Sequence, residues 1–134
     1  MIGVIDTEGD CAKWTFPADP GAVRAARAAV RDRLAAWNLD GLADVAALLV
    51  SELVTNSLRH ATGPIGVRLV RPGTDGILRV EVSDPLPDPP RERVADLDDE
   101  SGRGLQLVAN AADRWGTRPG ATGKTVWFEL SIPV

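Results

Sequence analysis

The chain has 134 residues, 44% hydrophobic and 25% charged, a size and composition that fit one globular domain with a single core. Its formal net charge of −4 argues against a general nucleic-acid or anionic-membrane surface, which needs clustered Lys and Arg. One cysteine and one histidine can form neither a disulfide framework nor a Cys/His zinc site, and no targeting signal or run of spanning length is recognised, so we expect a cytoplasmic protein.

The first two elements expected along the chain are a strand and a helix. The segment Ala12–Phe16 alternates, with Trp14 and Phe16 on one side, which predicts a short strand. Asp19-Pro20 then predicts a helix start, because Asp caps N-termini and proline fits the first turn. Apolar side chains recur after it every three or four residues, at Val23, Ala26, Val30, Leu34 and Trp37.

A second helix is expected to begin near Asp40 and to end at Ala61-Thr62-Gly63-Pro64, where glycine can cap it and proline forbids continuation. Glu52, Asn56 and His60 step about 40° apart on this helix and form one polar stripe. Apolar side chains project to nearly the same side, so we expect the stripe to interrupt a buried surface. Buried carboxylates and amides need partners, and a ligand is one source of them.

Two strands follow, Ile65–Arg71 and Ile77–Ser83, separated by a turn-rich segment. We assign Val67 and Leu69 to opposite faces of the first strand. In the second, the apolar side chains share one face and the opposite face is expected to be solvated. The apolar side chains of that strand are Leu78, Val80 and Val82.

The pattern breaks down between Pro85 and Arg103, which contains four prolines and many acids. A segment of this length in a small domain is more often a lid or binding loop than a linker. Apolar residues recur with helical spacing from Leu105, and a further short segment lies at Trp115. A last strand is expected from Val126 to Ile132, where every second residue is apolar.

Three further positions invite a functional interpretation, each with a simpler alternative. Asp84 ends a strand and can face a pocket, although Asp is also a common turn residue. Gly102 and Gly104 precede a predicted helix and can form an anion site, although two such glycines more often make a turn. The segment Gly123-Lys124-Thr125, taken alone, is a plain turn.

Taken in chain order, the polar stripe of the second helix and these three further positions resemble the nucleotide-binding boxes of the GHKL ATPase superfamily, the Bergerat fold. The segment ELVTNSLRHA and the sequence pattern GRGL…ADRWG look most like those of anti-sigma-factor serine kinases of the RsbW and SpoIIAB type, especially actinobacterial histidine kinase-like ATPase domains. The resemblance implies an α+β fold, a two-layer α/β sandwich whose mixed, mostly antiparallel sheet is covered on one face by helices. It implies one domain over residues 1–134 with an ATP-lid at about 85–103.

The same resemblance assigns roles to individual residues. It implies that Glu52 activates the attacking group, that Asn56 holds Mg²⁺, and that Arg59 reaches a phosphate. It implies that Asp84 receives the adenine amino group. The other nucleotide-binding positions that it implies are Gly102, Arg103, Gly104 and Leu105 along the phosphates, and Thr125 in support of Asp84.

The expected cofactors are therefore ATP and Mg²⁺, and the expected activity is a serine/threonine protein kinase. By resemblance its partners are a sigma factor, held inactive, and a STAS-type antagonist, which is phosphorylated. We expect no direct nucleic-acid or membrane partner, and homodimerisation stays open. One departure is that the family's D-x-G-x-G box is replaced here by Asp84-Pro85-Leu86-Pro87-Asp88, with proline and Asp88 in place of its glycines. This favours an alternative, a non-catalytic Bergerat module that sequesters a partner with weak or no nucleotide turnover; a third is an α/β domain whose polar stripe pairs internally.

Overall fold

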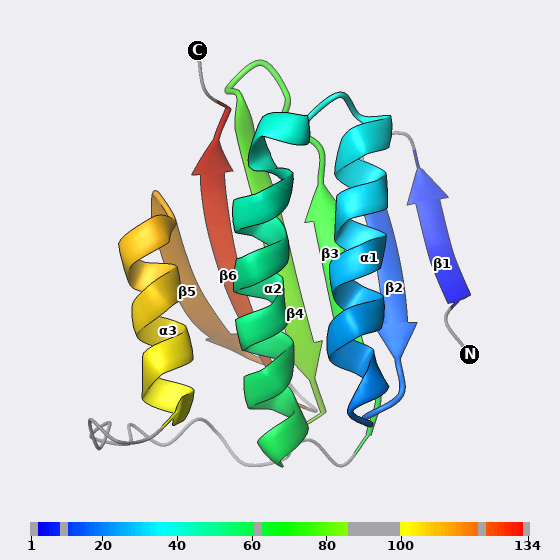
Figure 1. Cartoon of the computed structure of the whole chain (residues 1–134), viewed down its shortest axis with the longest axis vertical. Coiled ribbons are helices and arrows are strands. Elements are labelled where there is room, and N and C mark those ends of the chain that lie inside the picture. The colour runs from blue at the N-terminus through cyan, green and yellow to red at the C-terminus, as the bar shows by residue number, and fades with distance from the viewer. Residues whose placement is uncertain (1–2, 9–10, 61–62, 86–99, 121–122, 133–134) are drawn as a thin grey trace.

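The computed structural model describes residues 3–8, 11–60, 63–85, 100–120 and 123–132. Within these ranges, six strands form one sheet and three helices lie side by side over one of its faces (Figure 1). The strand order is β1-β2-β3-β4-β6-β5, and all five neighbouring pairs are antiparallel. The elements are β1 (Gly3–Glu8), β2 (Cys11–Phe16), α1 (Gly21–Ala36), α2 (Asp40–His60), β3 (Ile65–Val70), β4 (Ile77–Asp84), α3 (Glu100–Ala111), β5 (Arg114–Pro119) and β6 (Lys124–Ser131).

The expected two-layer α+β architecture is confirmed, and α2 begins at Asp40 as its sequence pattern indicates. Three details differ. The edge strand β1 was not expected, and α3 begins five residues before Leu105. The assignment of Val67 and Leu69 to opposite faces is wrong, because residues two apart on a strand share a face, and both side chains are buried.

The core lies between the sheet and the helices. Every second residue of the central strands faces the helices and is buried, as the alternation in the sequence predicts. Helix α1 contributes Ala26, Val30 and Leu34, as the spacing in the sequence predicts, whereas in its first turn Ala22 is buried and Val23 only partly so. The largest fully buried side chains are Phe16, Phe128, Leu34, Leu49, Leu53, Ile65, Leu69, Leu78, Val30, Val50, Val54 and Val67.

The turn between α1 and α2 brings the two helices together. Asn38 has a positive φ of 58°, which Asn tolerates better than most residues. The amide of Asn38 donates to the carbonyl of Ala35, and that of Leu39 donates to the carbonyl of Leu34 at 2.7 Å. This pair of bonds is a Schellman motif, which ends α1 and lets α2 return along it.

Helix α2 is long and strongly apolar. The segment Asp40–Arg59 has a mean hydropathy of 1.3 and, among the described residues, is the one long and apolar enough to cross a membrane by length and composition alone. The expectation that no run approaches this length is therefore wrong. Half of the segment is buried, and α2 contacts α1, α3, β4 and β6. Packing in the core accounts for its composition.

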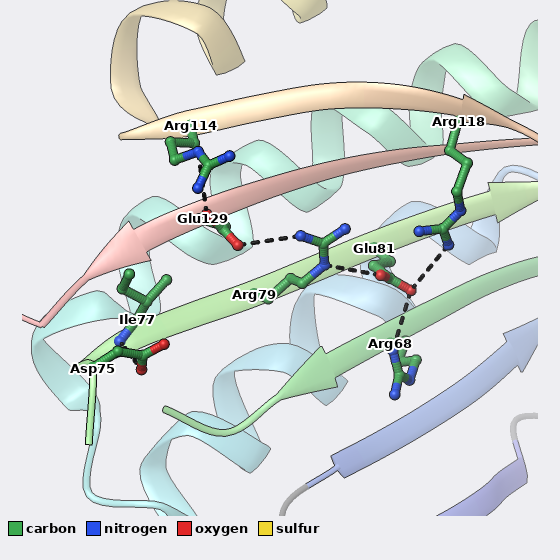
Figure 2. Close-up of polar contacts among 8 residues, drawn as sticks. All are labelled: Arg68, Asp75, Ile77, Arg79, Glu81, Arg114, Arg118 and Glu129. Atoms are coloured by element: carbon green, nitrogen blue, oxygen red, sulfur yellow. Dashed lines mark hydrogen bonds and ion pairs between the residues drawn. The ribbon is translucent and has the colours of Figure 1, made fainter. Parts of the chain in front are cut away.

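The sheet face away from the helices carries an ion-pair network (Figure 2). Glu81 is almost buried and lies 3.0 Å from Arg79 Nε, 3.4 Å from Arg68 Nη1 and 3.8 Å from Arg118 Nη2. Arg79 also contacts Glu129 at 3.2 Å. Burial raises the pKa of Glu81, but the hydrogen bond from Arg79 and the three positive charges outweigh it, so the pKa lies below its ordinary value of 4.5.

We expect Glu81→Gln to lower the free energy of unfolding by about 1–3 kcal/mol at pH 7, because it removes the charge on which three guanidinium groups converge. Because the pKa of Glu81 is lowered by folding, its stabilising effect is present above the unfolded-state pKa and is lost as pH falls through the folded-state pKa. Urea denaturation from pH 7 to pH 3 measures both. A difference between wild type and variant that is unchanged below pH 4.5 would contradict this account.

Candidate functional site

Asp84 is the last residue of β4, and its side chain points toward the helices, as those of Val80 and Val82 do. It is only 6% exposed. The hydroxyl of Ser57, on α2, donates a hydrogen bond to Asp84 Oδ2 at 3.1 Å, and both residues are buried. Because a buried carboxylate needs partners, this placement does not fit a solvent-exposed turn residue. Asp84 is held beneath the last turns of α2.

Two glycines allow the chain to close tightly around Asp84. A Cβ on Gly123 would overlap the carbonyl oxygen of Asp84 and lie 2.8 Å from Cα of Pro85. A Cβ on Gly63, just beyond α2, would lie 3.1 Å from Cγ of Pro85. The segments following α2, ending β4 and opening β6 therefore meet at backbone distance. Only glycine at position 123 permits this approach.

We expect Gly123→Ala to lower the free energy of unfolding by about 1–3 kcal/mol, because its methyl group would force Asp84 and β6 apart. Gly41→Ala is the matched control, since a Cβ at Gly41 in α2 meets nothing within 4 Å. Thermal unfolding of the two variants measures the effect. Equal unfolding midpoints would show that the contact at Gly123 does not constrain this part of the fold.

The polar stripe of α2 lies at the edge of the buried surface. Glu52 and Asn56 are half-buried and Arg59 is exposed. The expectation that the stripe interrupts a buried apolar surface is therefore only partly met, because neighbouring Leu48 is 47% exposed. Asn56 immediately precedes Ser57, the residue that contacts Asp84. The side chain of His60 lies outside the described residues.

The glycine segment is helical rather than a loop before a helix. Gly102 and Gly104 both lie in α3, whereas the sequence predicted a helix from Leu105. Glycine is disfavoured in helices by about 1 kcal/mol relative to alanine, but α3 packs on α2 and buries Val108. The amide of Gly102 is among the first four of α3, which lack intrahelical partners, whereas that of Gly104 is not.

Parts of the expected site cannot be placed. The side chains of Arg103 and Leu105 lie outside the described residues. The same holds for residues 86–99, which make up most of the expected lid at 85–103.

Thr125 does not lie beside Asp84. Its Oγ1 is 2.8 Å from Ser83 Oγ, and the two residues are direct neighbours across β4 and β6. Since Ser83 and Asp84 are consecutive in a strand, their side chains leave opposite faces of the sheet. The residue directly opposite Asp84 is Lys124, whose side chain leaves the same face. Lys124 and Ser57 are therefore neighbours of Asp84 that the motif comparison missed.

The four segments that the sequence singled out nonetheless lie close to one another in the fold. Figure 1 shows the last turns of α2, the end of β4, the start of α3 and the start of β6 at the same end of the molecule. Glu52 and Asn56, the Asp84–Ser57 pair, the amide of Gly102 and Lys124 belong to these segments. A buried carboxylate, an amide side chain and a helix N-terminus can together bind a ligand with an amino group and an anionic group.

The donor set bears on metal binding. Among the described residues, no group of three or more His, Cys, Asp or Glu side chains could hold a metal ion. A magnesium ion at Asn56 would therefore draw its other ligands from phosphate oxygens and water, which is how Mg²⁺ is usually held in nucleotide sites. Asn56 offers a carbonyl oxygen of the hard type that this ion prefers.

The fold is a two-layer α+β sandwich, and comparison with known protein families identifies its class. A family model described as "Histidine kinase-like ATPase domain" (HATPase_c_2) matches residues 16–130. The chain therefore belongs to the histidine kinase-like ATPase domain family. Membership in this GHKL-type family supports ATP binding with Mg²⁺ and ATP-dependent, kinase-like activity in general.

Among the solved structures that are similar to this chain is the histidine kinase domain from Erythrobacter litoralis EL346 blue-light activated histidine kinase. The sequence identity is 28% and the TM-score is 0.49. The match covers 67% of this chain and 44% of that one, so this chain corresponds to less than half of that protein chain. None of the curated proteins compared with the chain matches it.

Proposed function

We propose that this protein is an ATP-binding regulator, an anti-sigma-factor serine/threonine kinase that acts in the cytoplasm. The observation that carries the proposal is the buried Asp84 carboxylate, held by Ser57 next to Asn56 on the same helix turn. Adenine has an exocyclic amino group that can donate to Asp84, whereas guanine presents a carbonyl at that position. Asp84 would then select ATP over GTP, because the guanine carbonyl would bring an acceptor against an acceptor at that position.

The residues of α2 would handle the phosphates and the hydroxyl that attacks them. Mg²⁺ bound at Asn56 would neutralise phosphate charge. Arg59, exposed at the end of α2, and the amide of Gly102 in the first turn of α3 would support the transferred group. Glu52 lies one turn before Asn56 and would take the proton of a serine or threonine hydroxyl. The new bond from that oxygen to the γ-phosphorus forms as the bond to the β-phosphate oxygen breaks and ADP leaves.

The partners in this proposal are a sigma factor, bound and held inactive, and a STAS-type antagonist that supplies the hydroxyl. A direct test incubates the protein with γ-labelled ATP, Mg²⁺ and STAS-domain proteins from the same organism. We expect label on a serine or threonine of one STAS protein, and release of a bound sigma factor by the unphosphorylated form. ATP binding without transfer to any STAS protein would overturn the kinase proposal.

That result would favour a second candidate, a non-catalytic module that sequesters its partner. The specific observation behind it is Pro85, which follows Asp84 directly where the family has a flexible loop start. Its ring lies against Gly63, and Gly123 abuts its Cα. Proline has a fixed φ and no amide hydrogen, so the backbone beside Asp84 has little freedom to adapt to a nucleotide.

We expect Ser57→Ala to weaken ATP binding about three- to tenfold, because a hydrogen bond contributes about 0.5–1.5 kcal/mol and Ser57 orients Asp84. Ser51→Ala is the control: Ser51 is also buried on α2, but it donates to the carbonyl of Ala47 and accepts from Arg27 of α1. Isothermal titration calorimetry compares them. Equal ATP affinity for both variants would separate Ser57 from the nucleotide site.

A further inference from the structure

We propose that the sheet face away from the helices binds an acidic segment of a partner protein. The binding surface is the arginine cluster, which we define as Arg68 on β3, Arg79 on β4, and Arg114 and Arg118 on β5. Figure 2 shows these side chains on one face, grouped around Glu81 and Glu129. No described helix covers this face, and it lies across the sheet from Asp84, so the inference does not depend on the proposed kinase activity.

The cluster presents positive charge outward. The side chains of Glu81 and Glu129 are only 9% and 15% exposed, whereas those of Arg114 and Arg118 are 73% and 56% exposed. Four guanidinium groups against two carboxylates leave a local excess of positive charge on a chain whose net charge is −4. A basic surface on an acidic protein favours a local acidic partner over general anion binding.

The glutamates hold the arginine side chains in place but do not use all of their N–H donors. Arg79 is clamped between Glu81 and Glu129, and its guanidinium lies 4.3 Å from the ring centroid of Trp127. Arg114 and Arg118 reach glutamate oxygens through single nitrogens at 3.8 Å. A guanidinium has five N–H donors and binds carboxylates best in paired fashion. An external carboxylate would therefore find donors already aimed outward, which reduces the ordering cost of binding.

The floor of the surface suits a peptide. A Cβ on Gly116 would lie 2.8 Å from Cζ2 of Trp127, so the indole packs against the bare backbone of β5 and offers an apolar contact. Arg114 and Arg118 are four residue steps apart on β5, about 13 Å along the strand. Arg118 and Arg68 lie closer at their tips, because Arg118 Nη2 and Arg68 Nη1 contact the same oxygen of Glu81, at 3.8 and 3.4 Å. Carboxylates on an extended segment of four or five residues can span such distances.

Other occupants fit less well. A nucleic-acid backbone carries continuous negative charge, and Glu81 and Glu129 would repel it from the centre of the cluster. A second copy of the chain that used the same face would oppose arginines to arginines. An acidic protein segment can place its carboxylates over the arginines and leave the glutamates alone.

The test uses a fluorescein-labelled decaglutamate peptide and fluorescence anisotropy at low salt, with labelled decathymidylate DNA as the second arm. We expect saturable peptide binding that weakens at least tenfold in the double variant Arg114→Glu/Arg118→Glu. The control, Arg24→Glu/Arg31→Glu on α1, makes the same change in net charge and should bind as wild type does. The pairing of Arg31 with Asp44 is exposed, so its loss is minor.

Three results would overturn the proposal: no saturable peptide binding, equal weakening in the two double variants, or tighter binding of the DNA than of the peptide. The first denies the site, the second assigns the effect to net charge, and the third makes the face a nucleic-acid surface. A cooperative unfolding transition well above the assay temperature, and unchanged ATP titrations, establish that the arginine variants remain folded. The exposure of Arg114 and Arg118 makes intact folding the expected result.

Discussion

Replacing Asp84 with asparagine is expected to weaken ATP binding by about ten- to hundredfold while the protein stays folded. The variant loses the charge that strengthens the hydrogen bond to the adenine amino group, and hydrogen bonds to charged groups contribute about 1.5–3 kcal/mol. Asparagine has nearly the same shape, and its oxygen can still accept from Ser57. Calorimetric titration with ATP and Mg²⁺ measures the loss.

Thr125→Val is the informative control for Asp84→Asn. Thr125 lies on β6 one residue from Lys124, but its hydroxyl contacts Ser83 on the opposite face of the sheet. We therefore expect Thr125→Val to leave ATP affinity within about twofold of wild type, since valine is nearly isosteric. If Thr125→Val weakened binding as much as Asp84→Asn, the adenine contact would have to lie elsewhere than at Asp84.

Replacing Glu52 with glutamine is expected to lower the rate of phosphoryl transfer to a STAS partner by at least about 100-fold. A positioned general base typically contributes 10²- to 10⁴-fold, and glutamine cannot take up a proton. ATP affinity should change little, because in the proposed arrangement Glu52 contacts the attacking hydroxyl rather than the nucleotide. Single-turnover transfer of label from ATP, with ATP binding measured in parallel, separates the two effects.

Asp44→Asn serves as the comparison for Glu52→Gln. Asp44 is an exposed acid two turns earlier on α2, paired with Arg31 across the helix interface. We expect transfer by this variant to match wild type. Transfer that survives in Glu52→Gln at the wild-type rate would exclude Glu52 as the base and leave only the positioning of ATP to this helix.

The fold was largely accessible from the sequence because alternation and helical spacing report burial directly. Phe128 and Leu130 alternate with polar residues on β6 and face the core as expected. The edge strand β1 was missed, because GVIDTE carries no clean alternation and is held by pairing with β2. Helix α3 extends through two glycines because its packing on α2 outweighs their low helix propensity.

The candidate site could be predicted less well from the sequence, because the position of a motif does not show which way its side chains point. The position of Asp84 follows from strand parity with Val80 and Val82, and that logic also places Lys124, not Thr125, on the helix-facing side. Applying the alternation of β6 to its first residues would have revealed this. Ser57 offered a weaker signal, since its contact with Asp84 depends on how α2 crosses the end of β4.

Calorimetric titration of the wild-type protein with ATP and with GTP, each with Mg²⁺, tests most directly whether Asp84 lies in an adenine-nucleotide site. The placement of Asp84 predicts saturable ATP binding and GTP binding at least about tenfold weaker, because guanine presents a carbonyl oxygen where adenine presents its amino group. Equal affinity for ATP and GTP, or no saturable binding of ATP at millimolar concentration, would contradict it.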